Sequence, residues 1–207
     1  MFSLLVKEEG TLFSSIGVFD MMKGVAIVFD SRFDEGWRSD MDIMIIATWD
    51  GKEGEIFTDL DLSERLVGAK VWHITEPAWK ENKERLVGHN LHGEFKDSSI
   101  DLLKEIKQAS ADHFGHEGKR YTLYDIARWN KCRPLHTELI TKVRRQAAWL
   151  KGQHIRIARW AIEDARLCYD VYHKLLREGE VKISDALTGK KPIIPIKLAY
   201  NDGVEEE

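Results

Sequence analysis

Two aspartates, Asp30 and Asp164, follow or interrupt apolar patterns, where a carboxylate usually has a specific chemical role. Asp30 ends the apolar run VAIVFD, which predicts a buried strand with its carboxylate at the edge of a sheet. Asp164 falls on the apolar stripe of a predicted helix, where a carboxylate is costly unless it is paired or binds metal. Glu94 and Asp97 form a third acidic group after the run LVGHN. Carboxylates that converge from separate elements can hold two divalent cations about 4 Å apart for hydrolysis, and oxygen ligands suit Mg²⁺ or Mn²⁺.

The elements that must position these carboxylates follow a mixed α/β pattern. Short apolar runs predict strands in the first half of the chain, and helical spacing of apolar residues dominates from residue 98 onward. The predicted strands are 25–30, 42–49 and 54–60, joined as a meander, then 69–75 (a strand or the lead-in to one) and 86–90. The predicted helices are one capped by Ser98 or Ser99, then 121–129, 134–150 and 154–177. We expect a central sheet of about five strands flanked by helices.

Composition excludes several classes of protein. The chain has 207 residues, of which 43% are hydrophobic and 32% charged, as in an ordinary globular domain. No window approaches the roughly 18 apolar residues of a membrane-spanning helix, so we expect no membrane partner. Glu8 and Glu9 follow the short apolar start, which argues against a signal peptide. Two cysteines make no disulfide framework, and this favours a reducing, cytoplasmic setting.

A basic segment suggests a phosphate backbone as partner. Residues 131–159 contain eight Lys/Arg and one acid, Glu138, although the whole chain has a net charge of −4. Trp37 has polar neighbours and is the best candidate for stacking on an unpaired base. We predict single-stranded DNA or RNA as the partner, while a solvated helix surface is the alternative interpretation. The predicted basic contributors are Arg144, Arg145, Lys151, Arg156 and Arg159.

Three short segments together resemble the DEDD family of 3′–5′ exonucleases. They are VFDSR around Asp30, VGHNLHGEFKD at 87–97 and WAIED at 160–164, in the order and spacing of the family's three motifs. SIDLLKEI and the helix that begins EDARLCYD resemble the helicase-associated branch. The resemblance implies a ribonuclease H-like fold over residues 24–183. Residues 1–23 would then be an N-terminal extension and 184–207 an extended C-terminal tail.

Three motif positions of the family carry other residues here. The glutamate of the first motif falls on Arg32, and the tyrosine of the third motif falls on Trp160. The aspartate of the second motif falls on Lys96, with Asp97 one place late. Tryptophan has a single N–H donor and cannot act as a phenol does, and arginine brings a fixed positive charge to a metal-ligand position.

Asp30 and Asp164 match the family pattern, in which both residues bind metal. With Asp97 as a displaced third carboxylate they are the candidate catalytic residues, and Mg²⁺ or Mn²⁺ is the expected cofactor of an active enzyme. The first functional interpretation is a catalytically impaired, nucleic-acid-interacting exonuclease homologue, in which Arg32 and Lys96 neutralise the two aspartates in place of metal.

Two alternatives stay open. In the first, the chain is an active metal-dependent exonuclease in which Asp34 or Glu35 replaces the missing glutamate and Asp97 the missing aspartate. In the second, it is a non-enzymatic module for protein interaction that has kept the fold alone.

Overall fold

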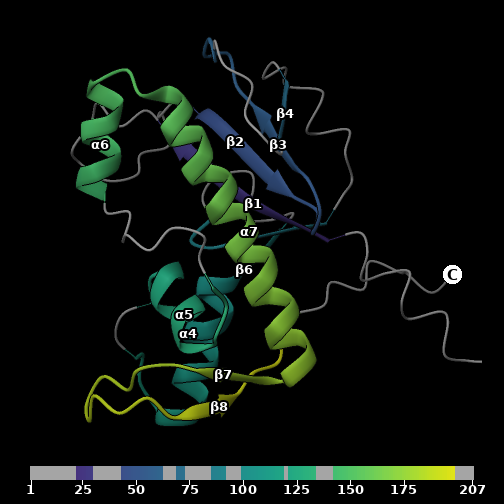
Figure 1. The fold of residues 1–207 in the computed structure, drawn as a ribbon. Coiled ribbons are helices and arrows are strands. Elements are labelled where there is room, and N and C mark those ends of the chain that lie inside the picture. Colours follow the sequence, from purple (N-terminus) through teal and green to yellow (C-terminus); the bar gives the residue numbers. More distant parts are fainter. Residues whose placement is uncertain are drawn as a thin grey trace, which may run out of the picture.

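The computed structural model describes residues 22–29, 43–62, 69–72, 85–91, 99–118, 121–133 and 142–198. Six strands form one mixed sheet in the order β4-β3-β2-β1-β5-β6 (Figure 1). Their bounds are β1 Met22–Phe29, β2 Ile43–Trp49, β3 Gly54–Phe57, β4 Ala69–Trp72, β5 Arg85–Gly88 and β6 Ser99–Asp101. Strands β1, β2 and β3 are an antiparallel meander. Strand β5 is parallel to β1, β6 to β5, and β4 to β3.

The predicted mixed α/β class is confirmed, with six strands in the sheet where the sequence indicated about five. The additional strand is β6, whose three residues were predicted to begin a helix. Ser99 belongs to this strand and does not cap the helix, while Ser98 lies outside the described residues. Asp101 is the cap, because its side chain accepts a hydrogen bond from the Leu103 amide. A three-residue strand is too short to show a strand pattern in the sequence.

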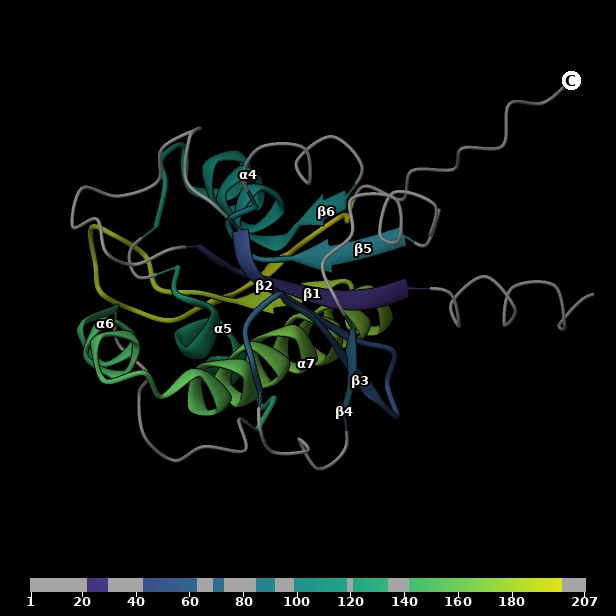
Figure 2. The same ribbon diagram turned by 90° about the horizontal axis from the view of Figure 1, so that it is seen from above.

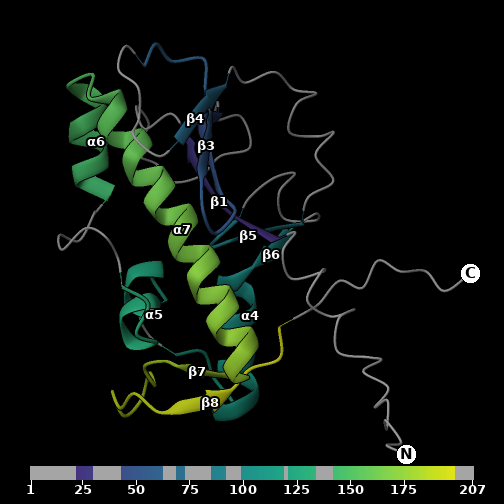
Figure 3. The same ribbon diagram turned by 45° about the vertical axis from the view of Figure 1, so that its right-hand side comes forward.

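Four helices accompany the sheet within the described ranges. They are α4 Leu102–Phe114, α5 Leu123–Trp129, α6 Lys142–Leu150 and α7 His154–Glu178. The longest, α7, lies along one face of the sheet, as Figure 3 shows with the sheet nearly edge-on. From above, α5 and α6 lie on the α7 side, while α4 lies beside β6 (Figure 2). In the part of the chain that is described, no helix is long and apolar enough to cross a membrane.

The contact between β1 and α7 is close because Gly24 has no side chain. A Cβ atom at Gly24 would lie 1.9 Å from the Ala165 carbonyl oxygen and 2.9 Å from the Tyr169 amide nitrogen. The neighbouring β1 residue, Val25, points to the other face of the sheet, where it packs with Ile46 and Leu91. Gly24 therefore sets how near α7, and Asp164 with it, approaches the first strand.

A small two-stranded sheet follows α7. Strand β7 (Glu180–Lys182) pairs antiparallel with β8 (Ile193–Pro195), and the Asn130 side chain bonds both the amide and the carbonyl of Lys182 at 2.8 and 3.0 Å. Residues 184–198, placed in the predicted tail, thus include a paired strand. Ile194 and Ile196 from this segment are buried in one core with α4, α5 and α7.

Candidate functional site

A cavity of about 530 Å³ opens between β1 and the turn that follows β5. Because β1 and β5 are parallel, their carboxyl ends meet at one edge of the sheet, the usual position for a ligand site in α/β proteins. Residues from five parts of the fold line the cavity: β1, the turn after β5, the region from α4 to α5, α6 and α7. Its polar side chains are His89, Asn90, Lys107, Tyr121, Thr122, Tyr124, Arg145 and Asp164.

An ion pair occupies the α7 wall of this cavity. Arg145, on α6, donates from Nη2 to Oδ2 of Asp164. The two side chains are only 24% and 16% exposed, so water screens their attraction weakly. Asp164 was predicted on the inward stripe of its helix, and the helix and its partly buried position are as predicted. The charge that compensates Asp164 is thus the guanidinium of Arg145.

The Tyr124 phenol lies beside the same carboxylate. Burial, together with the negative charge of Asp164, raises the pKa of Tyr124 far above its usual value. The phenol therefore stays protonated and remains a potential hydrogen-bond donor throughout the pH range in which proteins are stable. Tyr124 belongs to α5, which begins at the N-cap Thr122, so a short capped helix places a phenol next to a carboxylate 40 positions later in the chain.

Asp101 shapes the opposite wall. Its carboxylate accepts hydrogen bonds from the amides of Asn90 at 2.8 Å, Leu91 at 3.2 Å and Leu103 at 3.0 Å. Asn90 has a φ of 59°, a left-handed conformation that is uncommon for a residue with a side chain. One carboxylate thus holds the turn after β5 and the first turn of α4 together. Asp101 is therefore a structural residue of this wall.

Asp101→Ala is expected to destabilise the protein by about 2 kcal/mol, because three amides lose their acceptor and one of them lies in the first turn of α4. Chemical denaturation monitored by circular dichroism measures this change. Asp125→Ala is the matched control, since Asp125 also accepts a hydrogen bond near a helix start but from the Thr122 hydroxyl. Equal losses in the two variants would contradict the role assigned to Asp101.

His89 contributes a neutral ring to the cavity. Its Nε2 lies 2.5 Å from the Tyr121 carbonyl oxygen, so this nitrogen carries the proton and donates. Burial lowers the pKa of His89, which keeps the imidazole uncharged at neutral pH. The positive charges that face the cavity are therefore those of Arg145 and Lys107. Lys107 also pairs with Glu117 at 3.1 Å.

Several predicted site residues lie outside the described residues. These are Asp30, Asp97 and Trp37, together with Arg32, Lys96, Asp34 and Glu35, which the functional interpretations invoke. Asp30 follows the last residue of β1 directly in the sequence. Its placement in a metal site, and the neutralising role of Arg32 and Lys96, stay predictions.

The predicted basic contributors do not all face the cavity. Arg145 does, but it is engaged by Asp164. Arg144, Lys151 and Arg159 are exposed. Arg159 lies five residues before Asp164, about 140° around the helix, and so on a different side of α7.

Arg156 and Trp160 belong to a packing arrangement. The Arg156 guanidinium lies 4.9 Å from the centre of the Trp160 ring and also donates to Gln153 at 3.3 Å. Trp160 is 7% exposed and packs in the core between α7 and the sheet. The residue at the tyrosine position of the third motif is therefore a core residue, and the nearby phenol comes from α5.

The described residues form no metal-binding cluster of their own, and the predicted metal ligand Asp30 lies outside them. No group of three or more His, Cys, Asp or Glu side chains converges among them. The one candidate ligand that is described, Asp164, is engaged by a guanidinium. A divalent cation at this carboxylate would have to displace Arg145.

No protein-family model and no curated protein matches this chain. The fold and the site define its class: a mixed α/β protein whose strand-end cavity contains an arginine–aspartate pair and a buried phenol. Sequence reasoning did not identify Tyr124 or Asp101 as site residues. The only sequence signal for Asp101 was its place at the start of SIDLLKEI, and none connected Tyr124 with Asp164.

Proposed function

We propose that this chain binds single-stranded nucleic acid on a ribonuclease H-like fold and that phosphodiester cleavage is impaired. The single observation that carries the proposal is the Arg145–Asp164 pair in the strand-end cavity. In the resemblance to DEDD exonucleases, Asp164 is the carboxylate of the third motif, which binds a metal ion in that family. Here the guanidinium of Arg145 neutralises Asp164 in place of a metal ion.

The strand order supports the fold assignment. A meander followed by a parallel strand on the other side of β1 puts the carboxyl ends of β1 and β5 at one edge of the sheet. Helix α7 lies against β1 and carries the third motif. Residues of β1, of the turn after β5 and of α7, which are far apart in the chain, thus line one cavity, as a shared binding site requires.

A phosphate-bearing ligand suits the cavity wall. Lys107 lines it together with Tyr121 and Tyr124, whereas the charge of Arg145 is engaged by Asp164. Cations bind phosphates, and aromatic side chains provide surfaces on which unpaired bases stack without sequence readout.

An active exonuclease is the second candidate, and Tyr124 favours it. The phenol beside Asp164 could take the part that the family gives to the tyrosine at the Trp160 position. Asp30, Asp97 and the rescuing carboxylates Asp34 or Glu35 would then complete a site for Mg²⁺ or Mn²⁺.

One experiment separates these candidates. A fluorescein-labelled single-stranded DNA 20-mer and the same RNA are mixed with the protein in Mg²⁺, in Mn²⁺ and in EDTA. Anisotropy measures binding and a denaturing gel measures length. We expect binding in all three solutions and no shortening. For about three phosphate contacts, affinity should fall about 20-fold between 50 and 200 mM salt.

Two outcomes would contradict the proposal. Metal-dependent shortening that Tyr124→Phe or Asp164→Asn abolishes would establish the active enzyme, provided circular dichroism shows both variants folded. Absence of binding at 50 mM salt would reject a nucleic-acid partner and leave the protein-interaction module.

A further inference from the structure

One face of α5 leads from the cavity to a basic surface. Tyr124 lines the cavity, and Arg128 lies four residues later, on the same side of the helix. Lys131 follows three residues after Arg128, directly past the helix end. Arg128 and Lys131 are both exposed. The distance along the axis from Tyr124 to Arg128 is about 6 Å, so the cations begin one helical turn from the cavity wall.

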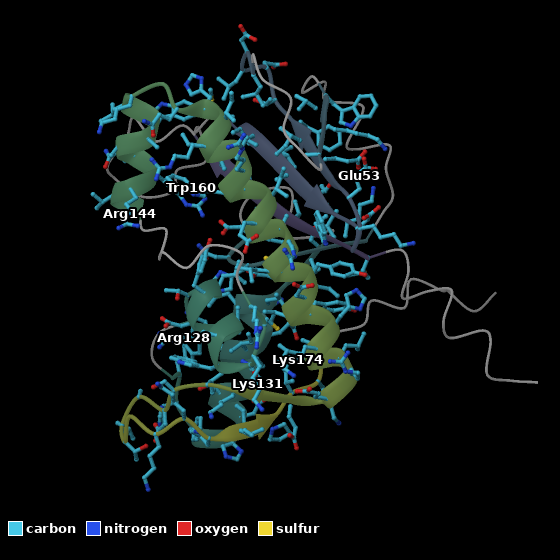
Figure 4. The ribbon with its side chains drawn as sticks, in the orientation of Figure 1. Glu53, Arg128, Lys131, Arg144, Trp160 and Lys174 are labelled. Atoms are coloured by element: carbon cyan, nitrogen blue, oxygen red, sulfur yellow. The ribbon has the colours of Figure 1, made fainter. Side chains whose placement is uncertain are left out.

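The end of α7 adds further cations beside α5. Lys174 and Arg177 lie in its last two turns, and Lys174 pairs with Glu178. The hydrogen bond from Lys174, with the nearby charges of Arg177 and Lys131, holds the pKa of Glu178 below its usual value. Figure 4 shows Arg128, Lys131 and Lys174 on the same side of the molecule. Because Lys174 and Glu178 form a neutral pair, the positive charge at this place comes from Arg177 and Lys131.

The hairpin between β7 and β8 supplies another fixed charge. The Lys191 ammonium lies 5.1 Å from the centre of the ring of Trp129, which is the last residue of α5. A cation held over an aromatic face has a restricted position, unlike a lysine that moves freely in water. Asn130 bonds the backbone of Lys182 and so fastens the end of α5 to β7. The cations from three elements are thus held on one rigid support.

We propose that these residues form the surface along which a single-stranded nucleic acid leaves the cavity. This α5 basic surface consists of Arg128, Lys131, Arg177 and Lys191, with the neutral Lys174–Glu178 pair beside it. The inference rests on the proposed function. It assigns the phosphate contacts to residues other than the five arginines and lysines predicted from the sequence, although Lys131 lies within the basic segment 131–159. A strand with one end in the cavity meets these cations along α5.

The α6–α7 basic residues are less suited to this task. Arg145 neutralises Asp164, and Arg156 packs on Trp160. Arg159 lies about 140° around α7 from the cavity residue Asp164. A backbone that follows α5 from Tyr124 meets Arg128 one turn later and Lys131 beyond the helix end, whereas two of these arginines are already engaged by other side chains.

The test compares two matched double charge reversals. Arg128→Glu/Lys131→Glu changes the α5 basic surface. Lys52→Glu/Lys104→Glu makes the same charge change at exposed positions, with Lys52 next to Glu53 at the other end of the molecule in Figure 4. Binding of the fluorescein-labelled DNA 20-mer is measured by anisotropy at salt concentrations from 50 to 200 mM. The variant Arg128→Gln/Lys131→Gln removes the same two charges with less effect on the end of the helix. It replaces the glutamate variant in the test if the glutamate variant does not fold.

We expect the α5 reversal to weaken binding at least tenfold at 50 mM salt. The slope of log affinity against log salt should become shallower by about 1.4, the value for two lost single-strand phosphate contacts. The glutamine variant should show the same change in slope with a smaller loss of affinity. The control pair should bind within about twofold of the unmodified protein.

Three results would overturn the inference, and they differ from failure of the proposed function. If the unmodified chain binds and the α5 variants bind equally well, the surface is wrong while the function stands. Equal weakening in the control pair would show a general effect of net charge. Displacement of DNA by polyglutamate at equal total charge would show a surface for acidic proteins. An unmodified chain that binds no nucleic acid rejects the proposed function itself.

Discussion

Gly24→Ala is expected to destabilise the protein by about 3 kcal/mol, the upper part of the usual range for overpacking. The new methyl carbon would lie 1.9 Å from the Ala165 carbonyl oxygen, and its other near neighbours are also backbone atoms of α7. No side chain can rotate away, so α7 has to move off β1. Asp164 precedes Ala165 and would move with the helix, so nucleic-acid binding should weaken as well.

Gly189→Ala is the control for this change. Gly189 has a φ of 68°, and a Cβ atom there would meet nothing within 4 Å, so alanine costs only the strain of a left-handed backbone, about 1 kcal/mol. Denaturation with urea measures both variants. If Gly24→Ala were no more destabilising than Gly189→Ala, the close approach of β1 and α7 would be wrong.

Arg145→Met is expected to destabilise the protein by about 2 kcal/mol. Methionine retains most of the buried volume, but the Asp164 carboxylate loses its partner in a position that is only 16% exposed. Oδ1 of Asp164 has no hydrogen-bond partner among the described residues, and the Tyr124 phenol beside it is neutral and so cannot replace the charge of Arg145. The cost comes from an uncompensated charge and not from lost packing.

A double-mutant cycle isolates this pair. We expect the free energies of unfolding lost in Asp164→Asn and in Arg145→Met to add up to more than the loss in the double variant. The difference, which is the coupling free energy of the pair, should be about 1–2 kcal/mol. Lys151→Met is the control, because Lys151 is exposed at the turn after α6 and should change stability by less than about 0.5 kcal/mol. Additive effects of Arg145→Met and Asp164→Asn would refute a stabilising interaction between Arg145 and Asp164.

Much of the fold follows from local patterns in the sequence. The runs VAIVFD and DIMIIATW predict β1 and β2 within a few residues, because a strand buried on both faces needs an uninterrupted apolar run. The 3.6-residue spacing predicts α7 from His154 within one residue of its observed end at Glu178. Strand β6 was missed because its three residues are ordered by pairing with β5 and not by their own pattern.

The candidate site, like the fold, was predicted only in part from the sequence. The sequence alone placed Asp164 on an inward helix face and indicated that a carboxylate there needs a compensating charge. Only the tertiary structure decided which charge that is, because Arg145 is 19 residues away on another helix and the choice depends on how α6 packs against α7. The same holds for Tyr124 and for the cations beside α5. Local periodicity determines which side of its own element a residue faces, whereas its neighbours across the core depend on the packing of whole elements.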